Sequence, residues 1–411
     1  RAPARHAPAE AGNPILIVWV VDGLLILVVA GLQPLIVDRF DRLTLTRWMA
    51  FGFALIFAGL RLLFTFNAPG WLNYALLYLL ADIQWLFFPL IFWILANDIF
   101  DIAQSKRLFP LIASWGFVGK LIGIGVAAVS PLLFAGINAR SQDMLVFNVL
   151  IYLVLYMLLQ VGLGKVKVRQ TMQKPESVRE ALVEGWDFVR EVPAFRYLTV
   201  VVVAVIMVET FIEFRFLVIS DRTFTNPDTY QTFYSLYRLG WTLLSIVIQA
   251  LVTSRLVEKI GLKNTFVILP FTALVSSVWM LAMPGIVSAV GGAVLLRLQQ
   301  YTIDESARKS FQALVPEERR GRVSMFMDSI LYAAGAILGC AITGALVWLG
   351  SRLATAGLDF YFYMGVSVLM ALVAIWAVFN MRRVYDTSLF NWRLKRRQRG
   401  ASVLDKLDFE Q

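Results

Sequence analysis

Ten ionisable side chains lie inside long apolar stretches of this sequence, where a charge is most costly. Charged residues at membrane depth usually face a polar cavity or one another. Basic residues in such positions can bind an anion, while acidic residues can hold protons or form ion pairs between helices. The ten residues are Asp22, Arg61, Asp82, Lys120, Glu209, Glu213, Arg215, Arg238, Arg297 and Asp328.

Basic residues within these stretches are the candidates for binding an anionic ligand. Lys120 is the sharpest candidate, because it lies mid-stretch between Gly119 and Gly123, and small residues allow helices to approach closely. The other candidates for this role are Arg215, Arg238 and Arg297.

Acidic residues within the same stretches are the candidates for gating or coupling. Glu209 and Glu213 are four residues apart and share one helix face, so they could hold protons or pair with Arg238 or Arg297. A purely structural role in ion pairs is an equally good interpretation of each residue. The full set of acidic candidates is Asp22, Asp82, Glu209, Glu213 and Asp328.

Several kinds of catalytic chemistry are disfavoured. Cys340 is the single cysteine and His6 the single histidine, so a thiolate metal site and histidine-based catalysis are not expected. Neither a GxxxxGK[ST] phosphate loop nor a GxSxG nucleophile elbow occurs. We therefore expect a non-enzyme that holds neither a metal nor a cofactor.

The elements that position these residues are membrane-spanning helices. The 411 residues are 59% hydrophobic and 16% charged, whereas a soluble domain carries about 25% charged residues. Eleven apolar stretches are each long enough to cross a bilayer, which needs about 20 residues. They are residues 14–37, 43–66, 71–96, 108–134, 143–163, 196–220, 230–253, 264–283, 286–303, 323–349 and 358–381.

Basic residues indicate how these helices are oriented. Most of the 38 Lys and Arg residues fall on one side when successive loops alternate, and that side includes the C-terminus. Positively charged loops stay in the cytoplasm, so we expect a cytoplasmic C-terminus and the inner membrane of a bacterium. The net charge of +10 thus reflects topology and contact with membrane lipid rather than nucleic-acid binding.

Two halves with similar patterns divide the chain. The first span ends with Leu35–Arg39 and the seventh with Leu251–Arg255, which is the weak internal symmetry typical of transporters built from repeats. Five spans precede the central basic loop and six follow it, so we expect a further helix upstream of residue 1. The predicted parts are a linker 1–13, a first bundle 14–163, a cytoplasmic loop 164–195, a second bundle 196–381 and a basic cytoplasmic tail 382–411.

The central loop contains an amphipathic helix. Ser177 and Glu180 form a capping box, and Val178, Leu182, Trp186 and Val189 follow on one helix face. We expect this face to lie on the cytoplasmic membrane surface, with packing on a separate cytosolic domain as the alternative. The tail could likewise lead into a cytosolic regulatory domain.

Two stretches carry a family resemblance. Phe92–Asp98 with Lys106–Leu111, and Tyr301–Asp304 with Asp328, are similar to the ATP/ADP translocase family of plastids and intracellular bacteria, a branch of the major facilitator superfamily. The resemblance implies two pseudo-symmetric six-helix bundles and nucleotide antiport. The sequence departs from the family at Ile303, where Phe is usual, and after Asp304, where Pro-Thr-Lys is usual. We interpret the chain as a divergent bacterial member.

These observations lead to three alternative functions. The first is an alternating-access transporter whose small-molecule partner is an anionic or zwitterionic metabolite, with a nucleotide as one candidate. The second is a lipid flippase or scramblase, because five basic and five acidic residues balance within the spans, whereas a free triphosphate calls for a basic excess. The third is a membrane sensor or anchor for a cytosolic domain.

Overall fold

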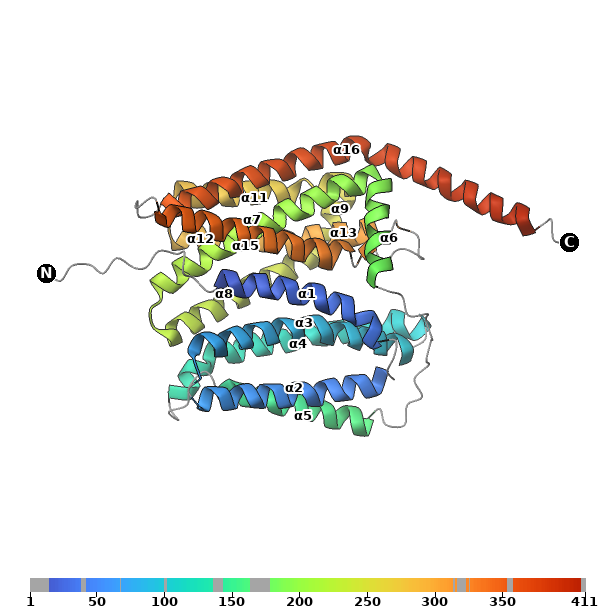
Figure 1. Cartoon of the computed structure of the whole chain (residues 1–411). Helices are drawn as coiled ribbons and strands as arrows, with labels where there is room; N and C mark the ends of the chain where they lie inside the picture. Colours follow the sequence, from blue (N-terminus) through green and yellow to red (C-terminus); the bar gives the residue numbers. More distant parts are fainter. Residues whose placement is uncertain are drawn as a thin grey trace. The chain divides into compact units, whose positions relative to one another are not determined.

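The computed structural model describes residues 15–37, 42–66, 68–99, 102–135, 143–162, 178–312, 315, 323–324, 326–352 and 358–407. These residues form helices and no strand (Figure 1). They divide into two compact units. The N-terminal unit holds residues 14–178 and 220–243, and the C-terminal unit holds residues 179–219 and 244–411.

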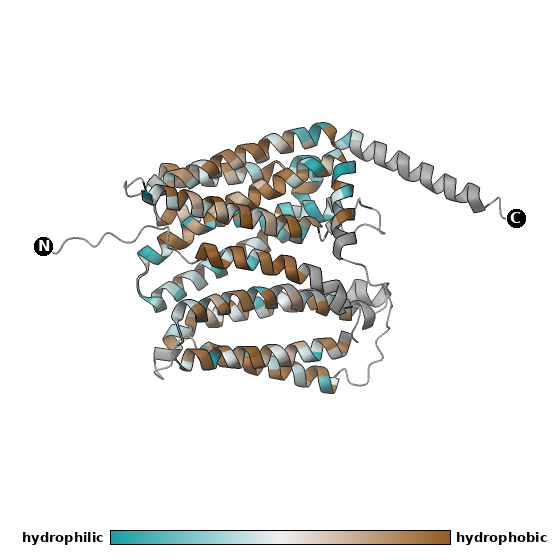
Figure 2. Ribbon diagram, in the orientation of Figure 1, coloured by the Kyte–Doolittle hydropathy of each residue, from teal (hydrophilic) through white to brown (hydrophobic). Residues whose placement is uncertain are grey.

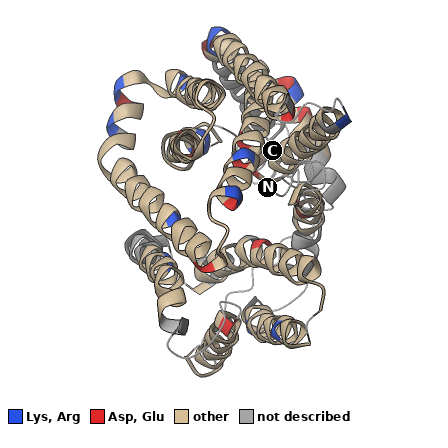
Figure 3. Cartoon of the chain, turned by 90° about the vertical axis from the view of Figure 1, so that its left-hand side faces the viewer, with Lys and Arg blue, Asp and Glu red and all other residues tan. Residues whose placement is uncertain are grey.

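Apolar composition is the reason that these segments are helical. A helix satisfies its own backbone hydrogen bonds, which a segment surrounded by lipid must do. Hydrophobic residues predominate along the helices (Figure 2). Large apolar side chains remain exposed there, as with Leu158 and Val161, and these surfaces suit lipid contact. Charged residues are sparse along the same helices (Figure 3).

Eight helices of the described residues are long and apolar enough to cross a membrane. The predicted spans 14–37, 196–220 and 286–303 also form helices, namely α1 (Ile15–Val37), α7 (Pro193–Thr223) and α12 (Ile286–Gln299). They are not among the eight, so the count of eleven spans stays a prediction.

The N-terminal unit is organised around α2 (Arg42–Thr65), which packs mainly on α5 (Met144–Gly162) and also on α3 (Gly70–Ile99). Aromatic rings fill this contact, with Phe53, Phe57 and Phe88 gathered around Tyr152. The unit also contains α1, which packs on α3, and α4 (Ile102–Ala135).

The first part of α8 (Pro227–Ile248) belongs to the N-terminal unit, although it follows the central loop in sequence. Gln231 of α8 donates a hydrogen bond of 2.6 Å to the Ser130 hydroxyl of α4. The same amide nitrogen donates a bond of 3.1 Å to the Ala127 carbonyl. These bonds place the side chains of α8 that precede residue 244 beside those of α4.

The C-terminal unit is a bundle in which α11 (Ile268–Ala282) packs on α12 and α16 (Leu358–Leu407), and α15 (Leu331–Arg352) packs on α16 (Figure 1). Hydroxyl groups of Ser277 and Ser367 hydrogen-bond at 2.8 Å between α11 and α16. Small hydroxylated residues of this kind are typical of contacts between membrane helices.

Three π-helical segments interrupt the helices of the C-terminal unit within the described residues: η3 (Gln249–Thr253), η4 (Gln300–Asp304) and η5 (Phe326–Ile330). A π-helical turn redirects the side chains that follow it and is frequent at functional sites. Two of these segments carry residues of the site described below.

The amphipathic helix α6 (Val178–Glu191) begins directly after Ser177, as the capping box predicts. Of its predicted apolar face, Val189 is buried within the C-terminal unit together with Phe188, while Trp186 is 55% exposed. A Cβ atom on Gly185 would meet the Phe326 side chain at 2.7 Å, so this glycine permits the close approach. The helix therefore packs on its own chain.

The remaining predictions about the ends and loops fall largely on residues outside the described ranges. These are the linker 1–13, residues 164–177 of the predicted loop 164–195, and the side chains of Asn97, Asp98, Lys106 and Arg107 from the family motif. In the predicted tail, α16 continues without a break from the last span to Leu407. The division into predicted domains stays a prediction.

Candidate functional site

An ion pair joins two predicted site residues in the C-terminal unit. Nη2 of Arg297, on α12, lies 2.6 Å from Oε2 of Glu213, on α7. Both side chains are about 15% exposed or less. This is one of the two pairings that the sequence left open for Glu213, and it leaves Arg297 already engaged by a carboxylate.

Glu209 lies one helical turn before Glu213 on α7 and has a different kind of partner. The amide nitrogen Nε2 of Gln300 donates a hydrogen bond of 2.7 Å to Oε2 of Glu209. The other amide atom, Oε1 of Gln300, is buried without a hydrogen-bond partner. The two glutamates thus share one face of α7 but have different partners.

A network of charges surrounds Arg308 on α13 (Glu305–Gln312). Its guanidinium binds Asp304 of η4 at 2.8 Å and Asp328 of η5 at 3.2 Å. Asp328 also accepts bonds from Lys309 at 2.6 Å and from Gln312 at 3.0 Å. The predicted coupling residue Asp328 therefore takes part in a network that links α13 to both adjoining π-helical segments.

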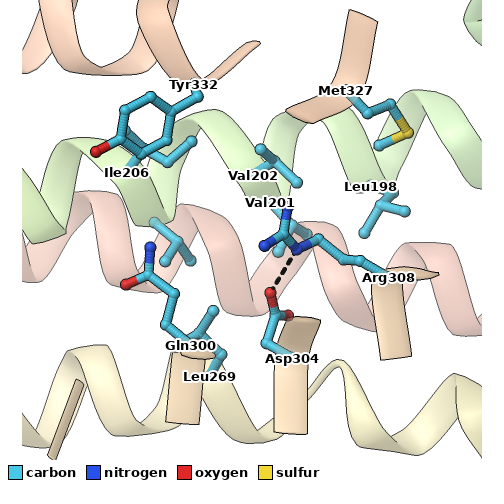
Figure 4. Close-up of a pocket in the computed structure, with 11 residues that line it drawn as sticks. Leu198, Val201, Val202, Ile206, Leu269, Gln300, Asp304, Arg308, Met327 and Tyr332 are labelled. Carbon is cyan, nitrogen blue, oxygen red and sulfur yellow. Dashed lines mark hydrogen bonds and ion pairs between the residues drawn. The ribbon is translucent and has the colours of Figure 1, made fainter. Parts of the chain in front are cut away.

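A pocket lies beside this network within the C-terminal unit (Figure 4). Gln300, Asp304 and Arg308 supply its polar groups, and the Asp304–Arg308 bond crosses it. The rest of the lining is mostly apolar: Leu198, Val201, Val202, Val205, Ile206, Leu269, Met327 and Tyr332. An apolar pocket with a few convergent polar groups can hold water or a small ligand.

Replacing Arg308 by methionine is expected to lower the free energy of unfolding by about 2 kcal/mol, because Asp304 and Asp328 lose a charged donor. Lys309→Met is the matched control. Lys309 is 57% exposed, so its loss should cost less than about 1 kcal/mol. Chemical denaturation in detergent micelles measures both, and equal effects would contradict a structural role for the Arg308 bridge.

A second group of charges forms in the N-terminal unit. Asp22 of α1 and Asp82 of α3 lie close enough for their carboxyl groups to interact, and Tyr78 also lies near Asp82. Arg238 of α8 lies within electrostatic range of Asp82. Three predicted site residues are therefore neighbours here.

Lys120 and Arg238 bring two positive charges together in the same unit. Lys120, on α4, lies within electrostatic range of Arg238, and its Nζ is 5.1 Å from the centre of the Trp241 ring. The Arg238 guanidinium is 5.9 Å from the centre of the Tyr234 ring. Cations over aromatic faces are stabilised at such distances. The unit thus presents two cations flanked by aromatic rings.

Arg215 differs from the other predicted anion-binding residues. It is buried in the C-terminal unit, with its guanidinium 3.9 Å from the centre of the Phe360 ring. Arg61 bonds Asp143 and Thr65 near one end of α2.

Several residues of these groups were not predicted as site residues. Gln300 and Trp241 are uncharged and give no sign in the sequence that they meet Glu209 or Lys120. Asp304 and Arg308 do carry a signal, since their spacing of four places both on one helix face at the end of an apolar stretch.

The helical bundles and apolar surfaces of the chain have the fold of solved membrane transporters. Similar solved structures include the nucleoside transporter NupG (16% identity, TM-score 0.59, 92% of this chain and 91% of that one). Another is the POT family transporter PepTSo (13% identity, TM-score 0.62, 91% and 90%). A third is a bacterial homologue of the iron transporter ferroportin in an inward-facing state (14% identity, TM-score 0.59, 91% of each).

The family follows from the sequence profile. The TLC ATP/ADP transporter family matches residues 57–296, which is more than half of the chain. The chain belongs to this family, which confirms the resemblance found at Phe92–Asp98 and its neighbours. No curated protein matches it significantly.

Proposed function

We propose that this protein is an alternating-access transporter of an anionic metabolite of the nucleotide class. The observation that carries the proposal is the pair Lys120 and Arg238, two like charges near each other in the N-terminal unit. Their mutual repulsion, which Asp82 offsets in part, favours the binding of an anion near both charges. The ring of Trp241 beside Lys120 offers a stacking surface for a nucleobase, which phosphate alone would not use.

Other parts of the proposal rest on family membership and charge. The family is named for transport of ATP and ADP, and this supports antiport, the exchange of one nucleotide for another. The basic tail supports a cytoplasmic C-terminus at a bacterial inner membrane. Arg297 and Arg215 are proposed as secondary anion-binding residues, and Asp22, Asp82, Glu213 and Asp328 as residues that gate the movement.

Lys120→Ala is expected to lower nucleotide counterflow in proteoliposomes at least about tenfold, because a charge-assisted bond to phosphate contributes about 1.5–3 kcal/mol. Lys120→Arg should retain part of the activity. The matched control is Lys263→Ala, which removes a lysine that is paired with Asp386 at the surface of the C-terminal unit. Folded protein that exchanges no nucleotide, or a Lys120→Ala variant that exchanges as fast as the wild type, would contradict the proposal.

A second candidate function is supported by the carboxyl pair. Asp22 and Asp82 stand beside the two cations, so the group as a whole is balanced and suits a zwitterionic lipid headgroup. A lipid flippase or scramblase would equilibrate labelled phospholipid between the leaflets of the same proteoliposomes. Lipid movement that Lys120→Ala abolishes, without nucleotide exchange, would favour this candidate.

A further inference from the structure

Among the described carboxyl groups at the centre of the C-terminal unit, Glu209 is the one bound by an amide and not by a cation. Glu213 is bound by Arg297, and Arg308 binds both Asp304 and Asp328, with Lys309 as a second partner of Asp328. Within the part of the chain that the structure describes, Glu209 makes no ion pair and is held by the neutral amide of Gln300. A carboxylate within a helical bundle and without its own cation is unfavourable.

Gln300 is suited to serve either charge state of this carboxyl group. At present its Nε2–H donates to a Glu209 oxygen, as a carboxylate requires. Its Oε1 is buried and without a partner. A half-turn of the amide would exchange the two atoms, so that Oε1 accepts a hydrogen bond from the O–H of a protonated Glu209.

The surroundings allow both the rotation and the arrival of a proton. Gln300 lies in the π-helical segment η4 and lines the pocket, which supplies free volume next to its side chain (Figure 4). Asp304 and Arg308 line the same pocket, and Arg308 bonds through Asp328 to Lys309, which is 57% exposed. Polar groups thus lead from Gln300 to a surface of the unit.

We propose that Glu209 is a proton-binding site of this transporter, with the Gln300 amide as the partner that bonds both its protonated and its ionised form. Binding converts the carboxylate and one proton from solvent into a carboxylic acid, and release reverses it. The ionisable groups within electrostatic range of Glu209 are Glu213 on α7, Arg297 on α12, Tyr301 on η4 and Arg308 on α13. Coupling this proton to substrate movement rests on the proposed transport function.

Infrared difference spectroscopy of the purified wild-type chain tests the site without any substrate. A pH change from acidic to basic should abolish a protonated-carboxyl band that is missing in Glu209→Gln and present in the control Asp386→Asn. Gln300→Met, which removes both amide atoms at similar volume, should displace the pH dependence of that band. A band that Glu209→Gln retains, or a pH dependence that Gln300→Met leaves unchanged, would overturn the proposal.

Proteoliposomes separate this proposal from the transport function itself. With nucleotide as substrate, an inward proton gradient should drive accumulation in the wild type, and Glu209→Gln should lose accumulation while keeping counterflow. If the wild type shows counterflow but its accumulation of nucleotide does not respond to the proton gradient, Glu209 does not couple protons to transport. The transport function itself would then still hold. Absence of both activities, with the Glu209 band present, would overturn the nucleotide assignment and keep the proton site.

Discussion

Replacing Arg297 by leucine is expected to lower the free energy of unfolding by about 3 kcal/mol. The substitution leaves Glu213 without the guanidinium that lies 2.6 Å from its carboxylate. Removal of one partner of a buried ion pair typically costs about 3–5 kcal/mol. Because both side chains are slightly exposed, we expect a value near the lower end of this range. Chemical denaturation in detergent micelles measures the change.

The double variant Arg297→Leu with Glu213→Leu is the informative control. It removes both charges, so no unpaired carboxylate remains, and most of the lost stability should return. A double-mutant cycle then gives the interaction energy of the pair. If the two single effects simply add in the double variant, the pair makes no net contribution and the bridge is not what holds α7 to α12.

Replacing Gly339 by leucine is expected to cost about 3 kcal/mol or to prevent folding, which is the second large effect. Gly335 and Gly339 form a GxxxG pair on α15, facing α7. A Cβ atom at Gly339 would lie 2.9 Å from Cβ of Thr210, whose hydroxyl is bonded at 2.9 Å to the Ile206 carbonyl. Thr210 is therefore held in place and cannot move aside.

The matched control for this prediction is Gly365→Ala on α16. No atom lies within 4 Å of a Cβ atom at this position, so the substitution should stabilise its helix by up to about 1 kcal/mol. Thermal unfolding in detergent compares the two variants with the wild type. A Gly339→Leu protein that unfolds at the wild-type temperature would show that α15 and α7 are not packed through these glycines.

Helix identity could be predicted from the sequence, because it depends on composition over short segments. Each of the eleven predicted spans overlaps a helix of the structure, and eight helices of the described residues are long and apolar enough for a membrane span. The capping box at Ser177 predicted the start of α6 for the same local reason. The ionisable residues of the candidate sites could also be identified, because a charged residue within an apolar stretch stands out in the sequence alone.

The hydrogen-bond and ion-pair partners of these side chains could not be predicted, because they depend on how each helix is rotated and shifted against its neighbours. Glu209 and Glu213 share a helix face, yet one meets Gln300 and the other Arg297. The first part of α8 joins the N-terminal unit through Gln231, although sequence order places it with the later helices. Trp186 and Val189 of α6 were predicted on one apolar face, yet the first is 55% exposed and the second is buried.

The sequence by itself thus determined an all-helical membrane protein of the transporter class and the family to which it belongs. Its apolar stretches, basic loops and short motifs are local features, and each acts without reference to distant residues. The tertiary structure alone decided which carboxyl group has a cation and which has an amide. That difference arises from contacts between residues about 90 positions apart, Glu209 and Gln300, which no local pattern encodes.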